Sequence, residues 1–377
     1  MDHGAVKLKA SGKPSAFEGV LLALALVLLQ ACAGGGCPAQ SLRREADRAG
    51  VLVGAAVDPA LFSESAYVET LAREFNMVQA ENVMKWGTIR PGPETFNFAP
   101  GDRVVAFARA HGMKVRGHTL LWSEYNPAWL VRGRFTPRQL RSVLREHVRR
   151  VMRHYAGQVF AWDVVNEVFL ADGRVEPSVW YDQPGIGLKG KGTAYVEQAF
   201  RWARAADPHT LLFYNDYDTE GLNPKSDAVY EMVKDFKRRG VPIDGVGIQA
   251  HIFNLDFKAL SSISANIERL AALGLQVHIT EMDVALPVDA AGRLRDPEDL
   301  ARQAEVYRLV AAACFASPRC TAFQTWGVTD RHSWIPNYTK GEKGAALLFD
   351  RDYAPKPAYR AVLDSLAAAP ARPTSRK

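Results

Sequence analysis

Residues 159–167 have the sequence Val-Phe-Ala-Trp-Asp-Val-Val-Asn-Glu. The apolar and β-branched residues at its centre predict a buried strand, and this strand ends on two polar residues, Asn166 and Glu167. β/α proteins commonly present an acid to a cleft on a buried strand that stops at a carboxylate. For one such pair alone, ordinary loop residues after a strand would be the simpler interpretation.

A second stretch, Leu-Gln-Val-His-Ile-Thr-Glu-Met-Asp at residues 275–283, also leads from an apolar run to carboxylates, Glu281 and Asp283. Two strands that each deliver a glutamate supply the minimum set of groups for hydrolysing a glycosidic bond with two carboxylates. The two stretches together therefore favour a functional interpretation of both strand ends.

From about Arg48 onward, β-branched runs alternate with amphipathic helical stretches. The predicted strands are 52–57, 77–80, 114–118, 160–165, 211–214, 245–250, 276–280 and 322–326. The predicted helices include 137–155, 195–206, 227–239, 297–316 and 357–367. Eight strands interleaved with helices predict an α/β protein, a single (β/α)8 TIM barrel over residues 41–370. An open doubly wound sheet is the alternative, but it would usually carry a glycine fingerprint after its first strand.

Polar and aromatic residues follow seven of the predicted strands. They include Glu81-Asn82 and Lys85-Trp86, His118 and Trp122, Asn166-Glu167, Asn215-Asp216-Tyr217, Gln249 and His251, Glu281 and Asp283, and Trp326. In a β/α barrel the carboxyl ends of all strands meet at one face, so these side chains are predicted to be neighbours. Tryptophan faces cover the apolar C–H surfaces of sugars, while amides and acids bind their hydroxyls.

Single tryptophans usually belong to the core, but Trp86, Trp122, Trp326 and Trp334 all lie just past predicted strand ends and so indicate a lined cleft. The histidines His118 and His251 could serve as metal ligands. No third His or Cys has ligand-like spacing, so hydrogen bonding to substrate or glutamate is the favoured role, and no metal is expected.

The composition limits the other classes of function. Of 377 residues, 47% are hydrophobic and 23% charged, which suits a large core and excludes global disorder. The net charge of +6 is spread along helices such as 138–153 rather than gathered in a run, so no nucleic-acid partner is expected. The chain has no phosphate-binding glycine loop, and we expect no cofactor.

The N-terminus has the order of an export signal. Lysines at 7, 9 and 13 precede an apolar run at 20–29, and small residues follow, so residues 1–40 are predicted to be a signal peptide with a short linker. The run is short for a retained membrane span. Residues 29–32, Leu-Gln-Ala-Cys, resemble a lipobox, in which Cys32 would carry a lipid and anchor the protein to the membrane. The protein is expected to be secreted, periplasmic or lipid-anchored, and monomeric, with a disordered tail at 371–377.

Two cysteines lie in the body of the chain, Cys314 and Cys320, separated by Phe-Ala-Ser-Pro-Arg. A short loop with proline can close a disulfide in an oxidising compartment, and two buried thiols are the alternative. No neighbouring residue would activate either thiol, so a catalytic cysteine is not expected.

Taken together, the motifs resemble those of the endo-β-1,4-xylanases of glycoside hydrolase family 10. The resemblance covers residues 42–366 and rests on Asp-Val-Val-Asn-Glu at 163–167, Ile-Thr-Glu-Met-Asp at 279–283, and the segments 81–86, 117–122 and 326–334. It implies a (β/α)8 barrel that hydrolyses internal β-1,4 bonds of xylan by retaining double displacement. The alternatives are a related hydrolase acting on β-glucans or short xylo-oligosaccharides, and a catalytically silent glycan-binding protein.

The resemblance also implies residue roles. Glu167 matches the general acid/base and Glu281 the nucleophile, with carboxyl groups about 5–5.5 Å apart. Asn166 matches the residue that binds the sugar 2-hydroxyl, and His251 the partner of the nucleophile, held by Asp283. Glu81, Asn82, Lys85, His118, Trp122, Gln249, Trp326 and Trp334 match glycone-side contacts, Trp86 is assigned to the same substrate-binding set, and Tyr217 matches an aglycone-side contact. We also expect the charge of Glu281 to raise the pKa of Glu167.

Two stretches depart from the family pattern. After Trp122 the family usually continues His-Ser-Gln, whereas this chain has Ser123-Glu124-Tyr125, so glycone binding is expected to differ. A stretch rich in Gly and Lys at residues 185–192 is expected to reshape the aglycone side.

Overall fold

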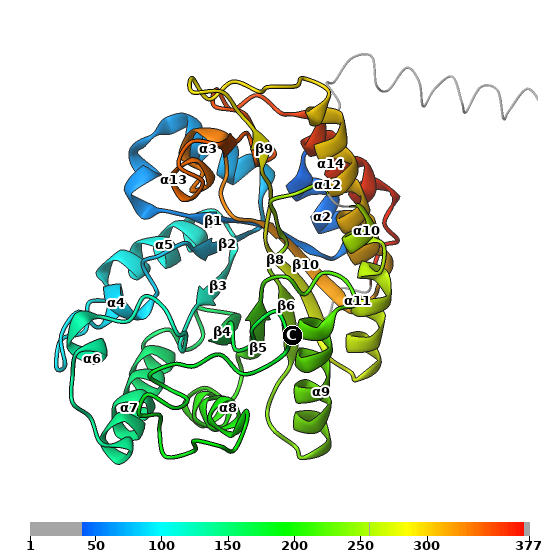
Figure 1. Ribbon diagram of the computed structural model, residues 1–377. Coiled ribbons are helices and arrows are strands. Elements are labelled where there is room, and N and C mark those ends of the chain that lie inside the picture. The colour runs from blue at the N-terminus through cyan, green and yellow to red at the C-terminus, as the bar shows by residue number, and fades with distance from the viewer. Residues whose placement is uncertain (1–39, 256, 373–377) are drawn as a thin grey trace, which may run out of the picture. The chain divides into compact units, whose positions relative to one another are not determined.

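Eight parallel strands form a closed barrel at the centre of the protein (Figure 1). In barrel order they are β1 (Leu52–Val57), β2 (Met77–Ala80), β3 (Lys114–His118), β4 (Ala161–Asn166), β5 (Leu211–Asp216), β6 (Gly245–Ile248), β8 (Gln276–Val284) and β10 (Cys320–Thr325). The barrel closes because β10 pairs with β8 on one side and with β1 on the other. This computed structural model describes residues 40–255 and 257–372, so the predicted signal peptide, the lipobox and Cys32 lie outside the described residues.

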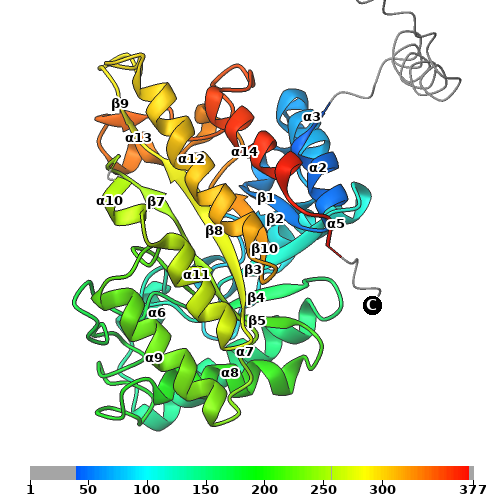
Figure 2. The same cartoon turned by 90° about the vertical axis from the view of Figure 1, so that its right-hand side faces the viewer.

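Helices surround the barrel. The longer ones are α2 (Leu42–Ala49), α3 (Ser65–Glu74), α5 (Ala99–Ala110), α7 (Pro137–His154), α8 (Ala194–Ala206), α9 (Pro224–Arg238), α11 (Ile263–Ala272), α12 (Asp299–Ala316) and α14 (Pro357–Ala368). Short elements in the connecting segments are η1 (Pro59–Ser63), α4 (Trp86–Ile89), α6 (Ala128–Val131), β7 (His251–Ile252), α10 (Phe257–Leu260), β9 (Leu286–Pro287), η2 (Asp330–His332), α13 (Ile335–Tyr338) and β11 (Lys343–Gly344). Figure 2 shows α11 and α12 in front of β8, with α14 beside α12. The prediction of a (β/α)8 barrel is confirmed.

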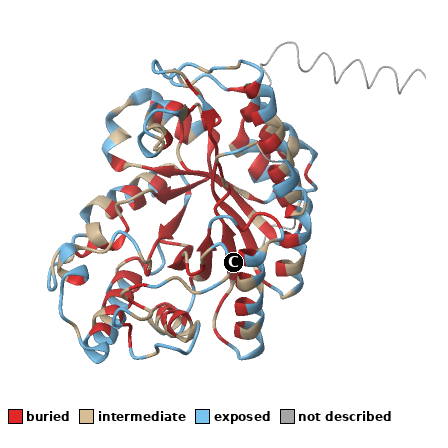
Figure 3. Cartoon of the chain, viewed as in Figure 1, coloured by how far each residue is buried: buried red, intermediate tan, exposed pale blue. Residues whose placement is uncertain are grey.

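Helix α7 illustrates how local sequence sets these elements. Thr136 and Gln139 form a reciprocal capping box at its start, with Pro137 at the first helical position. Its buried side chains, Leu140, Leu144, His147, Val148, Val151 and Met152, repeat at helical spacing along one face. In the barrel, by contrast, all six residues of β4 are buried, because a parallel barrel strand is covered on both faces. Figure 3 shows the buried strands inside a layer of helices with exposed outer faces.

Strands β1, β2 and β3 have the predicted bounds, whereas the five later strands differ by one to four residues at one or both ends, β6 and β8 with a clear cause. Strand β6 stops at Ile248, since Ala250 has a left-handed backbone with φ 63°. Strand β8 runs beyond the predicted end at residue 280 to Val284, because its last part pairs with β7. This extension places both Glu281 and Asp283 within β8.

The predicted disulfide joins Cys314 at the end of α12 to Cys320 at the start of β10, with the Cα atoms 5.1 Å apart. The packed chain also extends past the predicted boundary at residue 370. The Arg372 guanidinium donates to the carbonyl oxygens of Cys320 (2.7 Å) and Ser317 (2.9 Å), so this residue belongs to the folded unit rather than to a tail. Among the described residues, no helix is long and apolar enough to cross a membrane.

Candidate active site

Glu167 and Glu281 lie at the carboxyl end of the barrel. Glu281 is part of β8, whereas Glu167 directly follows β4 and has a left-handed backbone with φ 55°. Its N–H donates to the carbonyl oxygen of Asn215 in β5 at 2.9 Å. The left-handed residue thus ends β4 and turns the glutamate out of the strand direction.

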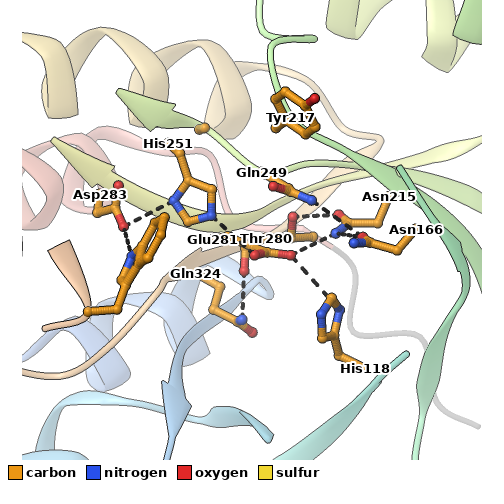
Figure 4. A network of polar contacts seen from close by, with 12 residues as sticks. His118, Asn166, Asn215, Tyr217, Gln249, His251, Thr280, Glu281, Asp283 and Gln324 are labelled. Carbon is orange, nitrogen blue, oxygen red and sulfur yellow. Dashed lines mark hydrogen bonds and ion pairs between the residues drawn. The ribbon is translucent and has the colours of Figure 1, made fainter. Parts of the chain in front are cut away.

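A bridge of two side-chain amides links the two glutamates. Asn166 Nδ2 donates to Glu167 Oε1 (2.9 Å), and Asn166 Oδ1 accepts from Asn215 Nδ2 (2.8 Å). The same Asn215 Nδ2 donates to Glu281 Oε1 at 2.7 Å, and Asn215 Oδ1 accepts from Thr280 Oγ1 at 2.7 Å. Figure 4 shows Asn215 between Asn166 and Glu281. Residues of β4, β5 and β8 are therefore held in one hydrogen-bonded unit.

Two further donors fix the carboxylate of Glu167. Gln249 Nε2 donates to Glu167 Oε1 and Trp122 Nε1 to Glu167 Oε2, both at 2.8 Å. Gln249, expected to contact the sugar, therefore also bonds the predicted acid. These donors restrict the carboxyl group to one orientation toward the cavity.

His251 lies between Glu281 and Asp283, which are the contacts predicted for it (Figure 4). Its Nε2 is 3.3 Å from Glu281 Oε2, and its Nδ1 is 3.0 Å from Asp283 Oδ2. Burial disfavours the imidazolium, but the charges of Asp283 and Glu281 outweigh it and raise the pKa of His251 to about 10. Trp334 Nε1 also donates to Asp283 Oδ2 at 2.8 Å, which fixes this aspartate in turn.

On the other side of Glu281 a buried ion pair supports His118. His118 Nδ1 is 3.0 Å from Asp163 Oδ2 and 3.9 Å from Glu281 Oε1. Asp163 is itself paired with the guanidinium of Arg116, and all of these side chains are buried. The charge of Arg116 and the bond to His118 outweigh burial and lower the pKa of Asp163. An ionised aspartate therefore orients His118 next to Glu281.

The two glutamates have pKa values shifted in opposite directions. Burial alone would raise the pKa of Glu281, but the hydrogen bond from His251 and the nearby His118 lower it. The pKa of Glu167 is raised to about 7. The charge of Glu281 contributes to this rise, but contrary to prediction it is not the main cause. Burial makes the largest contribution to the raised pKa, and the charge of Asp216 raises it more than the charge of Glu281 does.

A cavity of about 550 Å³ surrounds these groups. Of the fifteen residues predicted for the site, thirteen line it: Glu81, Asn82, Lys85, His118, Trp122, Asn166, Glu167, Tyr217, Gln249, His251, Glu281, Trp326 and Trp334. Asp283 lies behind His251. Residues 185–192 are absent from the lining, so the predicted effect of this stretch on the aglycone side has no counterpart there.

Trp86 does not line the cavity, contrary to prediction. It is 3% exposed and stacks between His147 (3.7 Å between ring centroids) and Trp180 (4.6 Å). Trp180 Nε1 donates to the carbonyl oxygen of Trp122 at 2.8 Å. Trp86 therefore lies one layer behind the cleft, because α4 begins at this residue and turns its ring toward α7.

Five lining residues were absent from the predicted site: Glu124, Tyr125, Asp218, Phe253 and Tyr338. Tyr125 is 51% exposed, and its ring is near-parallel to that of Trp122 with centroids 5.7 Å apart. The departure at 123–125 was a signal for this residue, whereas Phe253 and Tyr338 lie in connecting segments without a pattern. Asn215 was recognised as a strand-end residue, but its role as the bridge was not.

Within residues 40–255 and 257–372, no group of three or more His, Cys, Asp or Glu side chains is arranged to hold a metal ion. The cavity itself offers carboxyl, imidazole and amide groups. A protonated buried acid beside an ionised carboxylate provides a proton donor and a nucleophile.

Comparisons with known proteins agree with this geometry. The model of Glycosyl hydrolase family 10 matches residues 41–365. The chain is 40% identical over 347 residues to endo-1,4-beta-xylanase B of Thermotoga neapolitana, covering 91% of this chain and 96% of that protein. The crystal structure of native xylanase 10B from Thermotoga maritima matches at 42% identity and TM-score 0.79, over 86% of this chain and 98% of that one. Xylanase 10B from Thermotoga petrophila RKU-1, in complex with xylobiose, matches at 41% identity and TM-score 0.80, over 88% and 98%. The chain therefore belongs to glycosyl hydrolase family 10.

Proposed function

We propose that this protein is a retaining endo-1,4-β-xylanase that hydrolyses internal bonds of xylan. The observation that carries the proposal is the pair of glutamates with opposite pKa shifts, joined through Asn166 and Asn215 in one cavity. Family membership and the relatives named xylanases support xylan as the substrate.

The mechanism follows from the protonation states. Glu281, kept ionised by His251, attacks the anomeric carbon while Glu167 donates its proton to the leaving glycosidic oxygen. A glycosyl ester on Glu281 results. Glu167, now ionised, then accepts a proton from the water that cleaves this ester, and the anomeric configuration is retained. Direct attack requires carboxyl groups about 5–5.5 Å apart, and this spacing stays a prediction.

The cavity suits a chain of neutral sugars. Indole and phenol rings provide apolar faces for sugar rings, while Glu81, Asn82 and Lys85 form a polar group at one wall. Lys85 Nζ donates to Asn82 Oδ1 at 2.9 Å, and Asn82 Nδ2 donates to Glu81 Oε1 at 3.2 Å. This linked group offers both donors and acceptors to sugar hydroxyls.

The test is hydrolysis of xylan, cellulose and mixed-linkage glucan by the purified protein. We expect reducing ends to appear from xylan, with the β-anomer as the first product by NMR. Glu281→Gln should reduce the rate by several orders of magnitude, because the nucleophile is lost. If only the glucans are hydrolysed, the substrate is a β-glucan and not xylan. A first product with inverted anomeric configuration would contradict direct attack by Glu281.

The location of the protein also remains a proposal. The basic leader, apolar run and lipobox at residues 1–40 support export, followed by release or by lipid attachment at Cys32. Expression of the full chain with Cys32→Ser beside the wild type tests this. If Cys32 carries a lipid, only the wild type should partition into the detergent phase. Equal partitioning of the two proteins would show that the protein is secreted without a lipid.

A further inference from the structure

The peptide groups on both sides of the Glu167 side chain are fixed by strand β5. Glu167 has a left-handed backbone, which residues with a side chain rarely adopt, so its turn depends on the surrounding contacts. Its own N–H donates to the carbonyl oxygen of Asn215 at 2.9 Å. The next N–H, that of Val168, donates to the hydroxyl oxygen of Tyr214 at 3.0 Å. A side-chain hydroxyl therefore holds the residue that directly follows the predicted acid.

The chemistry of these groups fixes the direction of the Tyr214 hydroxyl. The Val168 N–H can only donate, so the phenol oxygen accepts from it and gives its single proton to Asp216. Asp216 also accepts from the N–H of Tyr217 at 2.9 Å and pairs with Lys225 Nζ at 2.8 Å. Tyr214, Asp216 and Lys225 are all at most 1% exposed. The contact to Val168 thus ends a chain of buried side chains.

We propose that Tyr214 is a positioning residue for the general acid, anchored by Asp216 and Lys225. It holds the turn after β4 so that the Glu167 carboxyl points at the glycosidic oxygen. This inference rests on the proposed function, because it requires Glu167 to protonate a leaving group. Tyr214 is absent from the cavity lining and so acts through Glu167 rather than on the sugar.

Charge effects on Glu167 must be separated from its position. The charged or titratable side chains that act on it include Asp216 and Glu281, whose negative charges disfavour its ionisation, and Lys85 and Tyr217. The pKa of Glu167 is about 7, so wild type and Tyr214→Phe are compared well below this pH, where Glu167 is protonated. Asp216→Asn removes a charge that raises this pKa, so its rates are taken from the protonated plateau of its own pH profile. Under those conditions a loss of rate means that the protonated Glu167 carboxyl is misplaced, and not that it has lost its proton.

The test compares two aryl β-xylobiosides that differ in their need for an acid. A phenyl leaving group requires a proton from Glu167, whereas 2,4-dinitrophenolate leaves without one. For Tyr214→Phe, kcat/KM for the phenyl substrate should fall about ten- to a hundredfold, as expected for a displaced catalytic group. For the dinitrophenyl substrate it should stay within about threefold of wild type, because nucleophilic attack by Glu281 is unchanged.

The matched control is Tyr155→Phe. Tyr155 is also fully buried and donates one hydrogen bond, to the carbonyl oxygen of Phe98 at 3.4 Å, but it is the C-cap residue of α7 and is absent from the cavity lining. Both substrates should be hydrolysed by this variant as by wild type. Equal losses on the two substrates by Tyr214→Phe, no loss on either, or the same selective loss in Tyr155→Phe would overturn the inference.

A second variant serves if Tyr214→Phe does not fold. Asp216→Asn keeps an acceptor for the tyrosine proton but removes the charge that anchors it. A loss confined to the phenyl substrate supports the proposal, and equal losses on both substrates overturn it. Failure of the wild type to hydrolyse any xylan-derived substrate would instead refute the proposed function, so the two failures are distinguishable.

Discussion

Glu167 and Glu281 are the same residue type, yet their pKa values move in opposite directions because their partners differ. Glu281 receives a hydrogen bond from a histidine with a pKa of about 10, whereas Glu167 receives bonds from the neutral donors of Gln249, Trp122 and Asn166. Neutral donors lower the pKa of a carboxylate less than burial raises it here. At the scale of single residues, the neighbours set which of the two glutamates holds a proton, and this supports the proposed division into acid and nucleophile.

This division predicts the pH dependence of the reaction. Glu167 must be protonated, so kcat/KM should fall as the pH rises through about 7 and the acid ionises. Glu281 must be ionised, so the acid limb should lie below its usual pKa of 4.5. A pH profile of kcat/KM checks both limbs, and an alkaline limb near pH 5 would contradict the raised pKa.

Glu281→Gln tests the cause of the shift. Removing a negative charge favours ionisation of Glu167, so its pKa should fall, but only part of the way from about 7 to 4.5 because burial and Asp216 remain. Titration of the Glu167 carboxyl by ¹³C NMR measures this change. Glu305→Gln on α12, an exposed carboxylate far from the cavity, should leave the titration unchanged. A complete return to 4.5 would make Glu281 the main cause after all.

At the scale of elements, the segment after β3 forms one wall of the cavity. His118, Trp122 and Tyr125 follow one another along it, and the carbonyl oxygen of Tyr125 accepts from the N–H of Gly87 in α4 at 2.9 Å. Lys85 Nζ lies among the rings of Trp122, Tyr125 and Trp326, at 5.1, 4.3 and 5.4 Å from their centroids. The departure from the family pattern thus adds a third ring around this ammonium group.

Tyr125→Ala should therefore weaken substrate binding. Loss of the ring removes an exposed aromatic face worth about 0.5–1.5 kcal/mol to a sugar ring, so KM for xylo-oligosaccharides should rise about two- to tenfold with little change in kcat. Val131→Ala, at an exposed site of α6 outside the cavity lining, is the control. If KM is the same in all three proteins, Tyr125 makes no contact with substrate.

At the scale of the whole molecule, the disulfide and the active site lie at opposite ends of the barrel. Cys320 begins β10, while the glutamates lie at the carboxyl ends of β4 and β8. The bridge closes a loop with a sequence separation of 6, for which loop entropy predicts about 2 kcal/mol. It ties α12 to β10 close to where Arg372 binds.

The double variant Cys314→Ala and Cys320→Ala should lower the free energy of unfolding by about 2 kcal/mol in urea denaturation. We expect kcat/KM for xylan to be unchanged below the unfolding transition, because the distant site keeps its hydrogen bonds. An unchanged free energy of unfolding would show that the disulfide does not constrain the unfolded chain. Loss of activity in the folded variant would contradict the independence of the active site from the disulfide.

The sequence by itself determined the barrel, its strand order and thirteen of the residues that line the cavity. These features follow from local patterns. The spacing of hydrophobic residues predicts whether a segment is a helix or a strand, and residues at the carboxyl end of a strand lie at the same face of the barrel. Trp86 shows the limit of this rule, because it follows a strand end and yet turns into the core with α4.

Only the tertiary structure decided the contacts of Asn215, Tyr214 and Asp216, and the cause of the raised pKa of Glu167. Hydrogen bonds between β4, β5 and β8 join residues up to 66 positions apart, and burial depends on every element that covers a group. Neither is encoded in local spacing. The physical reason is that the protonation of Glu167 depends on its distances to groups on other strands, and these distances are set only when the barrel closes.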